Sequence, residues 1–185
     1  MTVPLIRTDR LSLTVLERSD LKDIREYYLT NQAHLEPWEP ARSSAFHDLE
    51  TWRQRIKLAQ DERQSDRAVK LILRLSGTQP IIGVCNFTNI VRGPFQACNL
   101  GYSIDGANQG RGLMFEALQA AITHMFTHER LHRIMANHVP ENDRSARLLK
   151  RLGFEVEGQA KAYLHIAGAW RDHILTAKIN PHHPA

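Results

Sequence analysis

The stretch from Asn99 to Glu129 constrains the fold most, because it predicts a strand, a short turn and a long helix in direct succession. Alternating apolar residues predict the strand, and turn-forming residues at 105–108 end it. Beyond Gly112, apolar residues recur at the spacing of one helix face. The chain therefore turns a sharp corner at residues 109–112. The apolar residues are Leu100, Tyr102 and Ile104 in the strand and Leu118, Ala121, Ile122 and Met125 in the helix.

The corner itself, Gln109-Gly110-Arg111-Gly112, predicts an anion site. Its two glycines carry no Cβ, so backbone N–H groups at the start of the helix can face open space. The positive end of the helix dipole favours an anion there, and Arg111 adds a full charge. Phe115 stands where a dinucleotide fingerprint needs its third glycine, and no Gly-Lys-Ser/Thr sequence marks a nucleotide phosphate loop. A helix entry that merely contains glycines is the alternative interpretation.

Composition narrows the class of protein and its partners. The 185 residues, 42% apolar and 24% charged, predict one domain over 1–185 with a loose tail over 180–185. No apolar run reaches the roughly 18 residues of a membrane span, and the N-terminus lacks the apolar segment of a signal peptide. Two cysteines are no disulfide framework, so we expect a cytoplasmic protein without membrane contact. A net charge of +4 favours an anionic ligand such as a phosphorylated cofactor; RNA stays open as a partner, and DNA is not expected.

The rest of the chain predicts a mixed α+β fold, because helical and extended segments alternate irregularly. The segment from Asn31 to Ser44 is expected to be irregular and non-helical, since Pro37 and Pro40 stiffen it. In the second helix, Leu49, Trp52, Ile56 and Ala59 are expected to face inward. Further strands are predicted at 11–15, 68–75, 80–90, 133–139, 154–166 and 170–179, and further helices at 20–29, 48–62 and 142–152.

Two motifs resemble the GNAT acyl-CoA N-acyltransferases. Residues 109–114 resemble the family's pyrophosphate loop, Q/R-x-x-G-x-G/A, with Met114 in place of the last small residue. Asn142, Ser145 and the later Gly153-Phe154 are similar to the second signature, N-x-x-S/A before a helix that ends in Gly-Phe. A plain helix start, with Asn142 as the N-cap, is the alternative for this segment. The resemblance implies a twisted, mostly antiparallel mixed sheet of about seven strands flanked by about four helices.

The resemblance also implies acetyl-CoA as co-substrate and gives roles to individual residues. Asn142 would contact the pantetheine arm of the coenzyme. Ser145 would donate a proton to the departing thiolate, because the tyrosine that many family members use would fall at Leu149. The implied coenzyme-binding residues are Ser103, Ile104, Gln109, Gly110, Arg111, Gly112, Leu113, Met114, Phe115 and Asn142.

Further segments resemble the RimJ/RimL branch of the family, and most closely its RimJ group, over residues 5–178. In this branch Met114 is an ordinary residue of the loop. The resemblance implies that the acceptor is a protein N-terminus, the alanine of the fifth small-subunit ribosomal protein. Trp38 and Tyr163 would line the acceptor groove, and packing of the loop against the last hairpin is the alternative for them. The segments are Thr8-Asp9-Arg10-Leu11, Glu36-Pro37-Trp38-Glu39-Pro40, Val91–Phe95, Gly112–Leu118 and Gly168–His173.

Acid–base chemistry favours an α-amine acceptor independently. An α-amine with a pKa near 7.7–8.0 is roughly a quarter neutral near pH 7.5, whereas a lysine near 10.4 is about a thousandth neutral. An α-amine therefore needs little help from a base. Glu39, Glu116 and Glu157 are the candidates for that base, and Glu39 is preferred because its loop is expected to flank the acceptor groove. Cys85 and Cys98 lack the neighbouring histidine of an activated thiol, so we expect direct transfer without an acyl-enzyme.

Three functions remain open from the sequence. The first is acetylation of a protein N-terminus, with a transient ribosome contact by a monomer or weak dimer. The second is acetylation of a small amine, such as an amino acid, a polyamine or a drug. The third is a non-enzymatic factor that binds RNA or the ribosome, which the basic charge motivates. No metal is expected, since His124, His128 and His132 lack the carboxylate or thiolate ligands of a zinc site.

Overall fold

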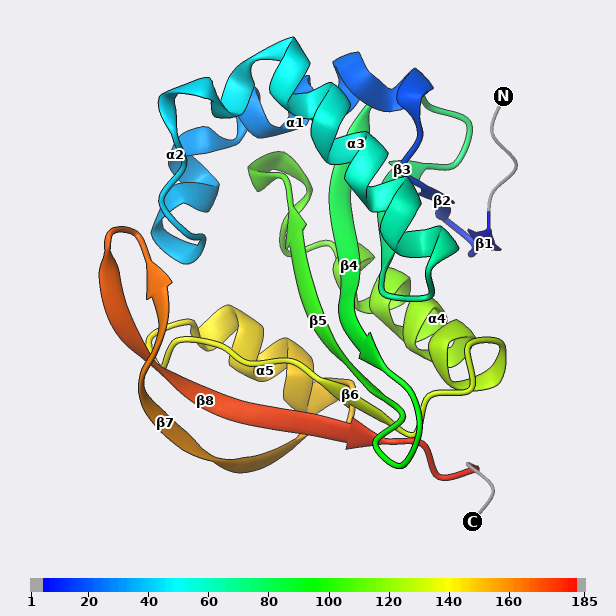
Figure 1. Ribbon diagram of the computed structural model, residues 1–185, viewed down its shortest axis with the longest axis vertical. Coiled ribbons are helices and arrows are strands. Elements are labelled where there is room, and N and C mark those ends of the chain that lie inside the picture. Colours follow the sequence, from blue (N-terminus) through cyan, green and yellow to red (C-terminus); the bar gives the residue numbers. More distant parts are fainter. Residues whose placement is uncertain (1–4, 183–185) are drawn as a thin grey trace.

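One mixed sheet runs through the part of the chain that the computed structural model describes, residues 5–182 (Figure 1). The expected mixed fold is confirmed. The elements beyond those expected are β1 and α2, and at two and four residues they are too short to leave a periodic pattern. The strands are β1 (Ile6–Arg7), β2 (Leu11–Val15), β3 (Val69–Leu75), β4 (Ile81–Val91), β5 (Ala97–Ile104), β6 (Arg133–Met135), β7 (Glu155–Ile166) and β8 (Ala169–Ile179). The helices are α1 (Leu21–Thr30), α2 (Gln32–Leu35), α3 (Leu49–Gln64), α4 (Leu113–Thr127) and α5 (Asp143–Arg151).

The sheet opens between β5 and β6. The strand order is β1-β2-β3-β4-β5-β6-β8-β7, and β5 with β6 is the parallel pair within the described residues. β6 pairs with β5 along Ala97, Cys98 and Asn99, whereas β5 continues to Ile104. Figure 1 shows β5 separating from β6 and β8 beyond this short contact. The C-terminal half of β5 therefore has no strand partner on that side among residues 5–182.

Helices cover both faces of the sheet. On one face, α4 and α5 form a core with β2–β5 that contains Leu118, Met125 and Leu149. On the other face, α1 and α3 pack on β3 and β4, with Ile24 and Ile56 buried. This arrangement holds the β5–α4 corner between two apolar cores.

The second predicted helix is confirmed as α3, with one difference in its inward face. Trp52, Ile56 and Ala59 are buried as predicted. Leu49 is 42% exposed, so its prediction is wrong. Leu49 is the first residue of α3, and the buried residues of the helix begin only at Trp52.

Three other segments differ from the expectation. Residues 31–44 contain α2 and a 3-10 turn at Glu36–Trp38, and Pro37 fits there because the first turn of a helix does not need its N–H. The strand predicted over 133–139 ends at Met135, and His138 adds an isolated bridge to Ile174. Asn180, at the start of the tail, is buried and donates to the Leu131 carbonyl at 3.1 Å, while 183–185 lie outside the described residues.

The predicted hairpin of β7 and β8 is confirmed, and it reaches the N-terminal half of the chain. The N–H of Ala167, at the hairpin tip, donates to the Glu39 carbonyl at 3.0 Å. In Figure 1 the hairpin curves around so that its tip lies near α2. The unpaired edge of β5 thus lies on the side of the sheet where α2, α5 and this hairpin are found (Figure 1).

Candidate active site

The glycine corner has the backbone shape that an anion site needs. Gly110 and Gly112 have φ of 71° and 75°, a left-handed backbone conformation that residues with a side chain rarely adopt. Gly112 is the N-cap of α4. The N–H groups of the first turn, Leu113, Met114 and Phe115, have no helical carbonyl before them to bond. They are therefore available, at the positive end of the helix dipole, to a bound anion.

The side chains of Leu113 and Met114, in the first turn of α4, point into the core. Leu113 and Met114 are 2% and 7% exposed and belong to the core. The sulfur of Met114 lies 4.0 Å from the Cys85 thiol. Of these two residues, only the backbone N–H groups are therefore available to a ligand, and the methionine side chain at 114 does not obstruct the corner. Arg111 is exposed and donates to the Asn108 side chain at 2.6 Å.

Glu116 supports the corner and is not a free base. Its carboxylate accepts from the Arg10 N–H at 3.0 Å, from Arg10 Nε at 2.6 Å and from the Thr8 hydroxyl. Burial raises the pKa of Glu116, but these hydrogen bonds outweigh it and hold the pKa below its usual range. Arg10 also donates to the Arg111 carbonyl at 3.0 Å. The β1–β2 turn thereby holds the corner in place.

The open edge of β5 turns backbone groups away from the rest of the sheet. Asp105 N–H donates to the Ile82 carbonyl on the β4 side, and Ser103 faces Val84. Antiparallel alternation therefore turns the backbone of Tyr102 and Ile104 away from β4, toward the opening. Ser103 alternates with these two residues, and its hydroxyl is paired with the Tyr27 phenol at 2.8 Å.

α5 begins on the far side of this opening, with Asn142 as its N-cap. The Asn142 side-chain oxygen accepts from the Ser145 N–H at 3.0 Å, as the capping interpretation predicts. The Ser145 hydroxyl lies 2.7 Å from the phenol oxygen of Tyr102. β5 and α5 are thus joined across the opening by a pair of hydroxyls. Leu149 is buried in the core and offers no hydroxyl.

Sequence reasoning missed Tyr102 as a polar residue of the site. The alternation of apolar residues in β5 assigned it to packing, and its ring does contact the core. Burial raises the pKa of Tyr102 to about 12, although the hydrogen bond with Ser145 acts in the opposite direction. The signal available in the sequence was the hydroxyl itself, since a buried tyrosine usually has a hydrogen-bond partner.

A polar chain crosses the mouth of the opening, and sequence reasoning missed two of its members. Arg144, in the first turn of α5, donates to the Gln109 side-chain oxygen. The Gln109 amide nitrogen lies 2.8 Å from Nε2 of His34 on α2, which is 3.3 Å from the Ile104 carbonyl. A cation at a helix N-terminus is unfavourable beside the helix dipole. The position of Arg144 in the first turn of α5 was therefore the feature of this motif that could have indicated a specific partner.

The acceptor residues predicted from the resemblance lie on the loop and the hairpin that border the opening. Trp38 and Tyr163 are 43% and 41% exposed. The Tyr163 phenol accepts from the Asn137 side chain at 3.4 Å, and its ring lies 5.5 Å from that of His173. The Glu39 carboxylate is ion-paired with Arg42. The loop also packs on the hairpin tip, so the packing interpretation describes part of the arrangement.

The other candidates for a base or a nucleophile, Glu157, Cys85 and Cys98, are paired or buried. Glu157 is ion-paired with Arg133. Cys85 and Cys98 are both 0% exposed, and burial raises the pKa of Cys98 to about 12. A buried thiol that stays protonated is a poor nucleophile. No described cysteine can therefore form an acyl-enzyme without rearrangement.

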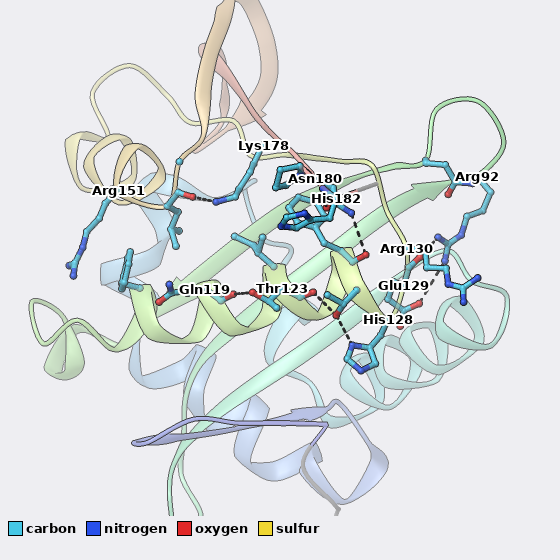
Figure 2. A pocket seen from close by; sticks show the side chains of 18 residues that line it. Arg92, Gln119, Thr123, His128, Glu129, Arg130, Arg151, Lys178, Asn180 and His182 are labelled. Carbon is cyan, nitrogen blue, oxygen red and sulfur yellow. Dashed lines mark hydrogen bonds and ion pairs between the residues drawn. The ribbon is translucent and has the colours of Figure 1, made fainter. Parts of the chain in front are cut away.

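A separate cavity of about 1270 Å³ lies along the outer side of α4 (Figure 2). It adjoins the glycine corner at Phe115 but contains no residue of 109–114. Arg151 lies over the Phe115 ring, with its guanidinium carbon 3.8 Å from the ring centroid. Figure 2 shows basic side chains around the cavity from the loop after β4, α5 and β8, among them Arg92, Arg151 and Lys178.

The histidines on α4 form no metal cluster. The rings of His124 and His128 stack at 4.6 Å, and His124 lies 3.8 Å from the Glu129 carboxylate. In residues 5–182 no group of three or more His, Cys, Asp or Glu side chains is placed to hold a metal ion. None of the described helices is long and apolar enough to cross a membrane.

Comparison with known proteins agrees with this geometry. Residues 10–155 match the model of the acetyltransferase (GNAT) domain family. The chain is 47% identical over 181 residues to the [ribosomal protein uS5]-alanine N-acetyltransferase of Escherichia coli, covering 97% of this chain and 93% of that protein.

Two solved structures are similar over almost the whole chain. The ribosomal-protein-S5-alanine acetyltransferase of Vibrio fischeri superposes with a TM-score of 0.92 at 40% identity, covering 97% of this chain and 98% of the other. Mycobacterium smegmatis RimJ in complex with CoA-disulfide gives 0.88 at 31% identity, over 95% and 84% of the two chains.

Proposed function

This chain belongs to the GNAT family of acetyltransferases, and we propose that it moves the acetyl group of acetyl-CoA to the N-terminal alanine of ribosomal protein uS5. The observation that carries the proposal is the opening between β5 and α5, with the glycine corner at one end and the Tyr102–Ser145 pair inside. The 47% identity to the uS5-specific relative supports the choice of acceptor. Such an acceptor makes the cytoplasm the site of the reaction.

The opening matches the parts of acetyl-CoA in order. The pyrophosphate would lie on the N–H groups that follow Gly112, beside Arg111. The pantetheine amides would bond the outward backbone of Tyr102 and Ile104, in the manner of an added strand. Asn142 would bond the pantetheine arm from the other side with its amide nitrogen. The thioester would then lie near Ser145.

The chemistry needs no covalent intermediate on the enzyme. The neutral α-amine attacks the thioester carbonyl, so that an N–C bond forms and the electron pair of the broken C–S bond stays on sulfur. The amine loses one proton to solvent, and the thiolate takes up one proton. Ser145 would donate a hydrogen bond to that sulfur, which needs only modest help because a thiol has a pKa around 8.5.

The acceptor would enter between the 36–39 loop and the β7–β8 hairpin. Trp38 and Tyr163 are exposed there and would contact the first residues of the acceptor. Glu39 would sit near the amine, held by Arg42, and would bind the amine or pass its proton to water. The amine pKa near 8 makes a strong base unnecessary.

Thiol release from acetyl-CoA with matched peptides tests the proposal. A peptide with the uS5 N-terminal sequence should be acetylated, and the same peptide with a formylated N-terminus should not. Release with the blocked peptide would mean lysine acetylation. Release only with spermidine or free amino acids would instead favour the small-amine function.

A further inference from the structure

The hydroxyl of Ser145 has a different kind of partner from the hydroxyls of Thr123, Thr127 and Ser65. Thr123 and Thr127 each donate to the carbonyl four residues earlier at 2.9 Å, and Ser65 donates to that of Asp61 at 2.6 Å. This back-bonding is the usual local choice for a hydroxyl on a helix. Ser145 instead makes its one side-chain hydrogen bond within residues 5–182 to Tyr102, at 2.7 Å.

The direction of this hydrogen bond follows from the two groups. A phenol is more acidic than an aliphatic alcohol, so Tyr102 is the better donor and Ser145 the better acceptor. Ser145 is also the one side-chain partner of the Tyr102 phenol among the described residues. With Tyr102 as donor, the proton of Ser145 remains free to point into the opening of the sheet.

The same geometry limits what Tyr102 can do. Its phenol is already paired with Ser145 at 2.7 Å, so its hydroxyl is committed to that neighbour. Its effect on the departing sulfur would therefore pass through the orientation of Ser145. Without the phenol, the Ser145 hydroxyl would lose its one described side-chain partner and would be free to rotate to another rotamer.

We propose that Tyr102 is a positioning residue of the acetyl transfer: it holds the Ser145 hydroxyl so that its proton faces the departing sulfur. The inference rests on the proposed role of Ser145 at the thioester. It makes β5 part of the leaving-group machinery in addition to its backbone contacts with the coenzyme.

A double-mutant cycle tests the proposal. Tyr102→Phe keeps the ring and should lower kcat about three- to tenfold, the effect of one neutral hydrogen bond, with the KM for acetyl-CoA unchanged. Ser145→Ala should lower kcat by about a hundredfold or less. In the Ser145→Ala background, Tyr102→Phe should have no further effect on kcat, because the group it orients is gone.

The matched control is Tyr27→Phe. It removes another phenol that is paired with a serine at 2.8 Å, on the opposite face of β5. Tyr27→Phe should change kcat by the same factor in the wild-type background and in the Ser145→Ala background. A thermal melt of each variant separates loss of folding from loss of turnover.

The outcomes separate the two proposals. If Tyr102→Phe lowers kcat equally in both backgrounds, or leaves the wild-type kcat unchanged, the positioning role is wrong while the role of Ser145 stands. If Ser145→Ala retains wild-type turnover when chemistry limits the rate, both roles are wrong. If the wild-type enzyme does not acetylate the uS5 peptide, the proposed acceptor is wrong, and the cycle is read with the amine that is acetylated.

Discussion

Replacing Gly112 with valine should weaken coenzyme binding in addition to straining the backbone. Gly112 has φ of 75° and precedes the free N–H groups of α4. An added Cβ would meet only Arg10 Nη2, at 3.6 Å, so the substitution causes no severe contact in the free protein. Its cost lies in the backbone, because a β-branched residue disfavours the left-handed region.

Two separate losses are expected, one in stability and one in coenzyme affinity. The backbone strain should lower the free energy of unfolding by about 2 kcal/mol, which corresponds to a Tm lower by about 4–8 °C in a chain of this size. Backbone rotation that relieves the strain would also turn an N–H away from the pyrophosphate. One lost hydrogen bond to a charged group reduces affinity by about ten- to a hundredfold.

Gly77→Val is the matched control. Gly77 has φ of 79° and stands in the turn between β3 and β4, where an added Cβ would have no other atom within 4 Å. This variant should lose the same stability and keep its coenzyme A affinity, measured by calorimetry below the Tm of both variants. Unchanged affinity in folded Gly112→Val, or an equal loss of affinity in Gly77→Val, would refute the placement of the pyrophosphate.

Three further results are expected. Arg151→Ala should weaken coenzyme A binding about tenfold but hardly affect dephospho-coenzyme A, if Arg151 beside Phe115 binds the 3′-phosphate; equal losses for both ligands would place that phosphate elsewhere. Glu116→Gln should destabilise the protein near pH 7, and chemical denaturation should find the difference from wild type shrinking as the pH falls below about 4. The sign follows because folding lowers the pKa of Glu116. The ionised carboxylate therefore stabilises the protein above the unfolded pKa, and this stabilisation is lost as the pH falls through the folded pKa. A stability difference that does not change with pH would contradict this role of Glu116. Tyr163→Ala should raise the KM for the acceptor peptide several-fold and leave acetyl-CoA affinity unchanged, and the reverse pattern would remove Tyr163 from the acceptor groove.

Much of the fold could be predicted because its signals are local. Glycines at 110 and 112, apolar alternation in β5 and helical spacing in α4 fix the central corner without reference to the rest of the chain. The short elements were not predictable, since β1 and α2 depend on packing rather than on periodicity. Asn180 shows the same limit at the tail, where a distant carbonyl at Leu131 holds a segment that composition marks as loose.

The site was predictable by motif and not by contact. Asn142 and Ser145 were proposed from the resemblance of their segment to a family signature, but the residue that Ser145 contacts across the opening was not. Tyr102 is 43 residues from Ser145 in the sequence, and its apolar neighbours hide its polar role. The ion pair of Glu39 with Arg42 spans only three residues, but nothing in the spacing predicted it, and it shows that the preferred base is not a free carboxylate.

The central claim is best tested by tandem mass spectrometry of purified uS5, with its N-terminal alanine free, after incubation with acetyl-CoA and this enzyme. Transfer to that alanine predicts one acetyl group, on the α-amine, and none on a copy of uS5 whose N-terminus is blocked beforehand. Acetyl groups confined to lysine side chains, or an unmodified uS5 beside acetylated small amines, would contradict it.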